Sequence, residues 1–176
     1  MTISATCRLQ PHPQTSCDAI DEVVVEIAVA SSEMLVVRTA IVGDLERLRI
    51  PAAGSSLDPD RLWAHTCCEL FVAPALGEGY VEWNFSPSGQ LARFAFSAYR
   101  ERIASPPPEI AGPTVAVSGR ELRLEARVPL PVAPGLRITP TAVIEDCTGA
   151  LSYWALRHPC ERPDFHHPDS FVLDLP

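Results

Sequence analysis

Lysine is absent from this 176-residue chain, and all 14 of its basic residues are arginines. Acidic residues outnumber them at 22, so the formal net charge is −8. A protein that binds nucleic acid or an anionic membrane usually presents a cluster of basic side chains. The arginines here are dispersed along an acidic chain, so we expect neither nucleic acid nor a membrane as a partner.

Long apolar runs are also missing, and no segment approaches the ~18 apolar residues that a membrane-spanning helix needs. Residues 1–19 lack the basic segment followed by an apolar one that marks a secretory signal. We therefore expect a cytoplasmic protein, in which cysteines stay reduced. The six cysteines form no CxxC pair, and we expect free thiols at Cys7, Cys17, Cys67, Cys68, Cys147 and Cys160.

Helical periodicity is absent over any stretch longer than about two turns, and the 18 prolines would interrupt most helices. The chain instead has about ten short β-branched or alternating segments, separated by Gly, Pro and Ser. This spacing predicts an all-β fold, a single antiparallel β-sandwich of the jelly-roll kind, forming one domain over residues 1–176. The expected strands cover residues 22–30, 34–42, 45–50, 66–73, 80–85, 90–97, 114–117, 121–128, 137–145, 151–156 and 170–173.

Residues 62–102 form the most unusual part of the sequence. Three expected strands joined by short turns that contain Gly and Pro predict an antiparallel meander. By strand alternation, Glu82 and Asn84 share one face of the sheet, whereas Trp83 lies on the other face. The meander carries more polar and aromatic side chains than a plain structural sheet needs: Trp63, His65, Glu69, Trp83, Glu82, Asn84 and Arg93. We expect its polar face to be the functional one.

Several motifs together carry a family resemblance. They are LWAHTC with Glu69, YVEWNFSPSG, Tyr99-Arg100, SYWAL with His158-Pro159, and PDFHH at residues 163–167. With these motifs the chain resembles the bacterial DOMON-like proteins, which are grouped with the type 9 carbohydrate-binding domains. The resemblance covers nearly the whole chain and implies a β-sandwich whose relatives bind sugars or haem. One departure is Cys68, where the family pattern usually has an aromatic residue.

A small-molecule site at the junction of the meander and the carboxy-terminal tail is the leading functional hypothesis. Indole faces stack on the C–H faces of sugar rings, while carboxylates, amides and guanidinium groups bind the hydroxyls. The tail is irregular and polar, so it can close over a cleft in the sheet. The predicted ligand-binding residues are Trp63, His65, Glu69, Glu82, Asn84 and Arg93 from the meander, and His158, Asp164 and His166 from the tail. The predicted ligand is a carbohydrate or a sugar derivative.

Two alternatives concern the meander itself. Arg93 could form a cross-strand ion pair with Glu82 or Glu69, which would give these charges a purely structural role. Cys67 lies two residues from His65 on an expected strand, so a nucleophile and a base could share one face. Glu and His residues on this face could then serve an uncharacterised enzyme, although we name no catalytic residue.

Two further alternatives concern metal and haem. The imidazole, thiol and carboxylate groups of residues 158–167 could bind a divalent metal, but their spacing matches no standard zinc motif. His65, His158 or His166 could be an axial ligand of haem, although the chain has no CxxCH attachment motif. We predict no cofactor and keep haem or a divalent metal as the alternative.

Overall fold

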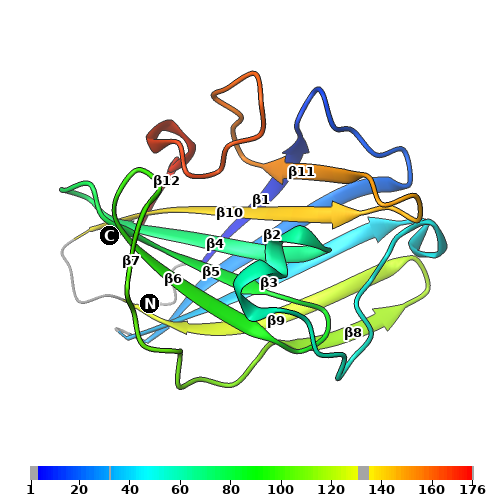
Figure 1. The fold of residues 1–176 in the computed structure, drawn as a ribbon, viewed down its shortest axis with the longest axis horizontal. Helices are drawn as coiled ribbons and strands as arrows, with labels where there is room; N and C mark the ends of the chain where they lie inside the picture. The colour runs from blue at the N-terminus through cyan, green and yellow to red at the C-terminus, as the bar shows by residue number, and fades with distance from the viewer. Residues whose placement is uncertain (1–3, 32, 131–134, 176) are drawn as a thin grey trace.

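A computed structural model describes residues 4–31, 33–130 and 135–175, so part of the expected 1–176 domain lies outside the described residues. Strands make up 53% and helices 7% of the structure, which confirms the all-β prediction (Figure 1). The strands are β1 (Ser4–Pro11), β2 (Ile20–Ser31), β3 (Met34–Gly43), β4 (Cys67–Pro74), β5 (Tyr80–Phe85), β6 (Leu91–Ala98), β7 (Glu101–Ile103), β8 (Thr114–Ser118), β9 (Glu121–Pro129), β10 (Leu136–Glu145), β11 (Leu151–Ala155) and β12 (Leu173–Leu175). The short 3-10 helices are η1 (Leu45–Arg47), η2 (Pro59–Ala64) and η3 (Pro168–Ser170).

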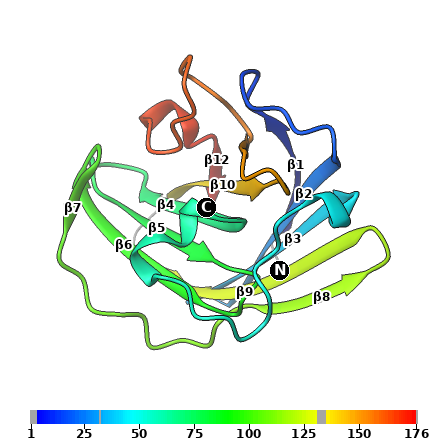
Figure 2. The same ribbon diagram turned by 45° about the vertical axis from the view of Figure 1, so that its right-hand side comes forward.

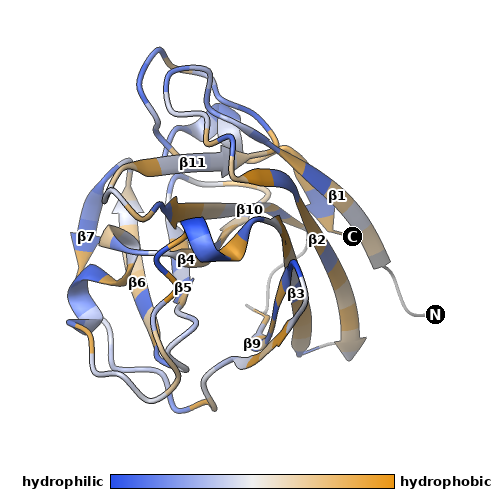
Figure 3. Ribbon diagram, turned by 90° about the vertical axis from the view of Figure 1, so that its right-hand side faces the viewer, coloured by the Kyte–Doolittle hydropathy of each residue, from blue (hydrophilic) through white to orange (hydrophobic). Residues whose placement is uncertain are grey.

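All of these strands belong to one antiparallel sheet in the order β7-β6-β5-β4-β10-β11-β1-β2-β3-β9-β8, with β12 added beside β10. Strand β1 joins the two halves of this sheet, because its first part pairs with β2 while Gln10 and Pro11 pair with β11. The sheet curls on itself, so that β2, β3 and β9 face β4, β5 and β10 (Figures 2 and 3). The result is the sandwich arrangement expected from the sequence.

The main hydrophobic core fills the space between the two halves. Strand β4 shows how alternation divides its side chains: Cys68, Leu70 and Val72 enter this core, while Cys67 and Phe71 point to the opposite face. Fully burying a side chain such as Leu70 contributes about 1.5–3 kcal/mol. The opposite face carries a second apolar group, the outer cluster, which consists of Leu62, Cys67, Phe71, Ala73, Tyr80, Ala92, Phe94, Phe96, Val143, Ala155, Phe165 and Phe171.

The prediction of a strand is wrong for two segments. Residues 45–50 form η1 and an extended segment, because the Leu48 N–H bonds to the Leu45 carbonyl and only one bridge, Leu48 to Asp146, reaches a neighbouring strand. Residues 170–173 are not a strand either, because Pro168 begins η3, and β12 starts only at Leu173. No helix in the described ranges is long and apolar enough to cross a membrane.

Candidate ligand-binding site

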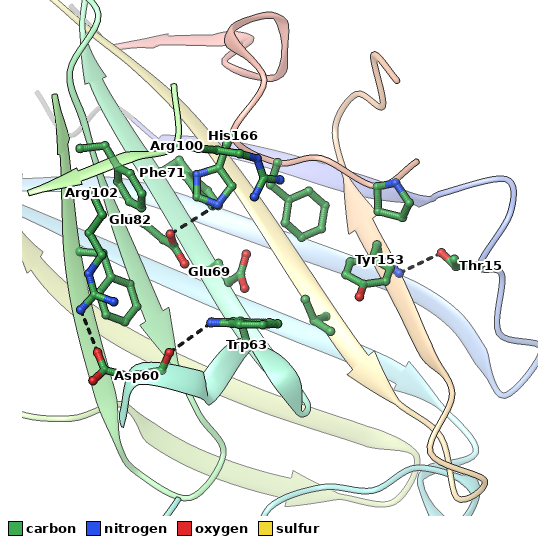
Figure 4. Close-up of a pocket in the computed structure, with 15 residues that line it drawn as sticks. Thr15, Asp60, Trp63, Glu69, Phe71, Glu82, Arg100, Arg102, Tyr153 and His166 are labelled. Carbon is green, nitrogen blue, oxygen red and sulfur yellow. Dashed lines mark hydrogen bonds and ion pairs between the residues drawn. The ribbon is translucent and has the colours of Figure 1, made fainter. Parts of the chain in front are cut away.

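A cavity of about 460 Å³ opens on the outer face of the sheet, where the meander meets the carboxy-terminal tail (Figure 4). Its size falls within the range of about 300–1,000 Å³ that is typical of small-molecule sites. The strands supply Glu69, Phe71, Glu82, Phe94, Phe96, Val143 and Tyr153. The surrounding segments supply Thr15, Asp60, Trp63, Arg100, Arg102, Pro163, Phe165 and His166.

Strand alternation and register place two glutamates side by side in this cavity. Glu69 of β4 is directly opposite Asn84 of β5, and Glu82 is opposite Phe71, so the two carboxyl groups are diagonal neighbours on one face. Asn84 Nδ2 donates to Glu82 Oε1 at 2.7 Å, and Thr141 Oγ1 donates to Glu69 Oε2 at 3.0 Å. Only 4% of Glu69 and 5% of Glu82 is exposed, so both residues are buried at the base of the cavity.

Burial makes both carboxyl groups weak acids. Burial first, and then the neighbouring Glu82, raises the pKa of Glu69 well above its ordinary value, against the hydrogen bond from Thr141. Burial also raises the pKa of Glu82, and the hydrogen bond from Asn84 and the charges of Arg102 and Arg100 oppose this rise. The pair therefore retains a proton to a higher pH than two exposed glutamates would.

Two arginines border the cavity, and each is held by an aspartate. Arg100 Nη2 lies 2.8 Å from Asp164 Oδ1, and Arg102 Nη2 lies 2.8 Å from Asp60 Oδ1. The Arg102 guanidinium also lies 4.1 Å from the ring centre of Phe94. Arg100 occupies the turn between β6 and β7 with a φ of 57°, a conformation uncommon for residues other than glycine. These contacts fix both guanidinium groups at the cavity wall.

Asp164 anchors the tail against this turn. Burial alone would raise its pKa, but hydrogen bonds from Tyr99 and Arg100, with the charge of Arg100, lower the pKa below its ordinary value. Tyr99 Oη donates to Asp164 Oδ2 at 2.6 Å, and the backbone N–H of His166 donates to Oδ1 at 3.1 Å. Asp164 therefore acts on the cavity indirectly, by holding Arg100 and His166 in position.

His166 closes the cavity from the tail side. Its Nδ1 lies 2.8 Å from the hydroxyl of Tyr80, and its Nε2 lies 3.7 Å from Glu82 Oε2. Burial, together with the charge of Arg100, lowers the pKa of His166 to about 4, against the charge of Asp164. The imidazole is therefore neutral at neutral pH, so its contact with Glu82 is not an ion pair there.

Trp63 forms the opposite side of the cavity. It belongs to η2 and is 44% exposed, unlike Trp83 and Trp154, which are each 4% exposed. Its Nε1 donates to the carbonyl of Asp60 at 3.2 Å, which fixes the orientation of the indole. Figure 4 shows this ring on the η2 side of the cavity, across from Glu69 and Glu82. A flat apolar face is thus presented to the cavity beside polar groups.

The structure brings only some of the predicted site residues together. Trp63, Glu69, Glu82 and His166 line the cavity, whereas Asn84 is fully buried behind Glu82.

His65 lies elsewhere, because its Nδ1 pairs with Glu145 Oε2 at 2.9 Å outside the cavity. This position also separates His65 from Cys67, whose thiol is buried and contacts Asn84 Oδ1 at 3.8 Å. Burial also raises the pKa of Cys67 well above its usual value, so the nucleophile–base pair that we considered as an alternative is not formed.

Arg93 and His158 also lie away from the cavity. Arg93 is opposite Trp83 in the ladder between β5 and β6, and its guanidinium lies 5.7 Å from the Trp83 ring. It is therefore on the other face of the sheet, and the ion pair with Glu69 or Glu82 that we considered is excluded. His158 Nε2 lies 2.8 Å from the Gln10 carbonyl, where the ring fastens the tail to β1.

The tail does not form a metal site in the described ranges, where no group of three or more His, Cys, Asp or Glu side chains is arranged to hold an ion. All six cysteines, which lie in these ranges, are free thiols. Cys67 and Cys68 point to opposite faces of β4, as alternation requires.

Several cavity residues were missed from the sequence: Phe94, Phe96, Arg100, Arg102, Tyr153 and Phe165. The signal for two of them was present, because Phe94 and Phe96 alternate in β6 on the face that Glu82 also occupies. Arg100 and Arg102 could be placed only by the tight turn into β7, a strand that the sequence did not predict.

No family model matches the chain, and no curated protein matches it. A solved structure, the crystal structure of a candidate carbohydrate-binding protein from Bacteroides uniformis ATCC 8492, is similar. The two align with a TM-score of 0.55 and 17% sequence identity, over 93% of this chain and 83% of that chain. The two proteins share a fold. At this identity the likeness concerns the fold alone, and the DOMON-like resemblance stays a prediction.

Proposed function

We propose that this chain is a β-sandwich that binds a carbohydrate or a sugar derivative in the cavity between the meander and the tail. The observation that carries the proposal is that one cavity combines an exposed indole, Trp63, with two buried carboxyl groups and two fixed guanidinium groups. Sugar rings have apolar C–H faces and a rim of hydroxyls, and these surfaces match such a set. The motif resemblance to DOMON-like proteins and the name of the structural neighbour support the same ligand class.

Each part of the cavity has a role in this account. The Trp63 indole stacks on one face of the ring, and the aromatic rings of Phe94 and Phe96 pack on its apolar edge. Glu69 and Glu82 accept hydrogen bonds from ligand hydroxyls or, when protonated, donate them. The guanidinium of Arg102 keeps N–H groups beyond its bond to Asp60, and these can donate to ring or hydroxyl oxygens.

The test is isothermal titration calorimetry with a panel of mono- and disaccharides, followed by variants tested on the sugar that binds. Trp63→Ala should weaken binding by at least about tenfold, because it removes the stacking surface. His65→Ala, which removes a ring outside the cavity, should change affinity by less than about twofold. Equal losses in both variants, or no binding of any sugar at about 10 mM, would contradict the proposal. Sugar recovered unchanged after incubation supports binding, whereas a new product would indicate an enzyme.

A further inference from the structure

The charges around the cavity are not balanced. Asp60, Glu69 and Glu82 line it together with Arg100 and Arg102. Arg102 forms an ion pair with Asp60, and Arg100 forms one with Asp164, which does not line the cavity. Within the described part of the chain, no arginine lies within ion-pair distance of Glu69 or Glu82, and the one imidazole that does, His166, is neutral. The two glutamates are thus buried acids without a cation of their own.

Each glutamate also has an oxygen left over. Asn84 occupies Glu82 Oε1, and Thr141 occupies Glu69 Oε2. In the ranges that the structure describes, neither Glu82 Oε2 nor Glu69 Oε1 accepts a hydrogen bond, although both residues are buried. Figure 4 shows the two carboxyl groups pointing into the cavity. Neither oxygen is among the fully buried polar atoms without a partner in the described residues, so both are open to the cavity and available to a ligand that supplies donors and positive charge.

Most of the remaining lining is aromatic: Trp63, Phe71, Phe94, Phe96, Tyr153 and Phe165. The face of an aromatic ring carries partial negative charge and attracts cations, most strongly where water is excluded. Aromatic walls around a carboxylate floor therefore favour an organic cation over a neutral group of the same size.

We infer that the ligand carries a protonated primary amine, as an amino sugar does, and that its ammonium group binds between Glu69 and Glu82. An ammonium group has three N–H donors, enough to satisfy both free carboxyl oxygens at once, whereas a neutral hydroxyl has one. The sugar part of this ligand rests on the proposed function, but the amine part rests on the carboxyl pair and the aromatic walls around it.

Binding of an ammonium group has a consequence for protons. Burial raises the pKa of both glutamates, so the empty pair retains a proton more readily than exposed acids do. The ammonium group stabilises the ionised carboxylates, so the retained proton leaves for the buffer when the ligand binds. A neutral sugar has no charge with which to displace that proton, so proton release separates the two classes of ligand.

The experiment compares matched amines and alcohols by calorimetry on the full chain. The probes are D-glucosamine, D-galactosamine and D-mannosamine, their neutral parent sugars and N-acetyl derivatives, and cyclohexylamine with cyclohexanol. Each titration is run in two buffers of different ionisation enthalpy, neither of them a primary amine, so that the difference in heat reports proton release. We expect at least one amine to bind at least about tenfold more tightly than its neutral counterparts, with proton release.

Variants assign the effect to the carboxyl pair. Glu82→Gln and Glu69→Gln keep the shape and an acceptor oxygen but remove the charge, and each should reduce the amine preference by at least about tenfold. Glu161→Gln removes one exposed carboxylate outside the cavity and should leave the preference unchanged. Thermal melts check that the variants are folded.

Each outcome separates the two claims. A neutral sugar that binds as tightly as its amine, without proton release, overturns the amine inference and leaves the carbohydrate proposal standing. Binding of cyclohexylamine with no binding of any sugar supports the carboxyl pair as an ammonium site and overturns the carbohydrate proposal. The absence of binding by every probe at about 10 mM overturns both.

Discussion

The hydroxyl of Tyr80 lies 2.8 Å from Nδ1 of His166, which joins strand β5 to the carboxy-terminal tail. The same hydroxyl accepts the backbone N–H of Arg100 at 3.0 Å, so its own proton is available for His166. The neutral imidazole then carries its proton on Nε2, the atom that faces Glu82. One phenol thus orients the tail, the β6–β7 turn and the cavity wall together.

Tyr80→Phe should therefore destabilise the protein by about 1–2 kcal/mol, because it leaves the Arg100 N–H and His166 Nδ1 without a partner. Urea unfolding measures the change. Tyr153→Phe is the matched control, because in the described residues the Tyr153 hydroxyl makes no hydrogen bond, and this variant should cost less than about 0.5 kcal/mol. Similar costs for the two variants would show that the Tyr80 bridge does not stabilise the fold.

Acid should weaken the fold through His166. Burial lowers the pKa of this imidazole to about 4, from a usual value of 6.5. Between pH 6.5 and 4 the unfolded chain therefore binds a proton that the folded chain does not, so stability falls as the pH falls through this window, by about 2–3 kcal/mol from this group. The difference in unfolding free energy between parent and His166→Gln should change by this amount. Parallel pH curves would rule out a buried neutral imidazole.

Glu69 should act in the opposite direction. Because burial raises its pKa, the folded chain binds more protons than the unfolded chain above about pH 4.5, and stability from this group falls as the pH rises through the window up to the raised pKa. Glu69→Gln removes the buried charge and should make the protein more stable at pH 8 by at least about 1 kcal/mol, with a smaller gain at pH 4.5. Chemical unfolding at both pH values measures this, with Glu161→Gln as the control. A destabilised Glu69→Gln protein at pH 8 would mean that the native carboxylate is well solvated or paired.

The sequence predicted the strands well because alternation is local. Residues 80–85 were predicted with the observed bounds, and Glu82 and Asn84 share a face because they are two residues apart on one strand. The face of Arg93 depends on the register of the next hairpin, which pairs it with Trp83. Alternation within one strand does not fix that register, so Arg93 was grouped with Glu82.

Residues outside the strands were harder to place for a different reason. His65 and His158 lie where the chain leaves regular structure, and their positions follow from single contacts with Glu145 and the Gln10 carbonyl. The Tyr80 hydroxyl reaches a tail residue 86 positions away, a contact that no local pattern encodes. Such contacts appear only once the tail has folded against the sheet.

The most direct test of a sugar site in this cavity is a titration followed through the indole N–H signals in a ¹H–¹⁵N NMR spectrum. The chain has three tryptophans, and Trp63→Phe identifies the signal of the one at the cavity. We predict that D-glucosamine, or whichever sugar in the panel binds most tightly, shifts the Trp63 signal saturably while the buried Trp83 and Trp154 signals move far less. A bound sugar that leaves the Trp63 signal in place would contradict the account.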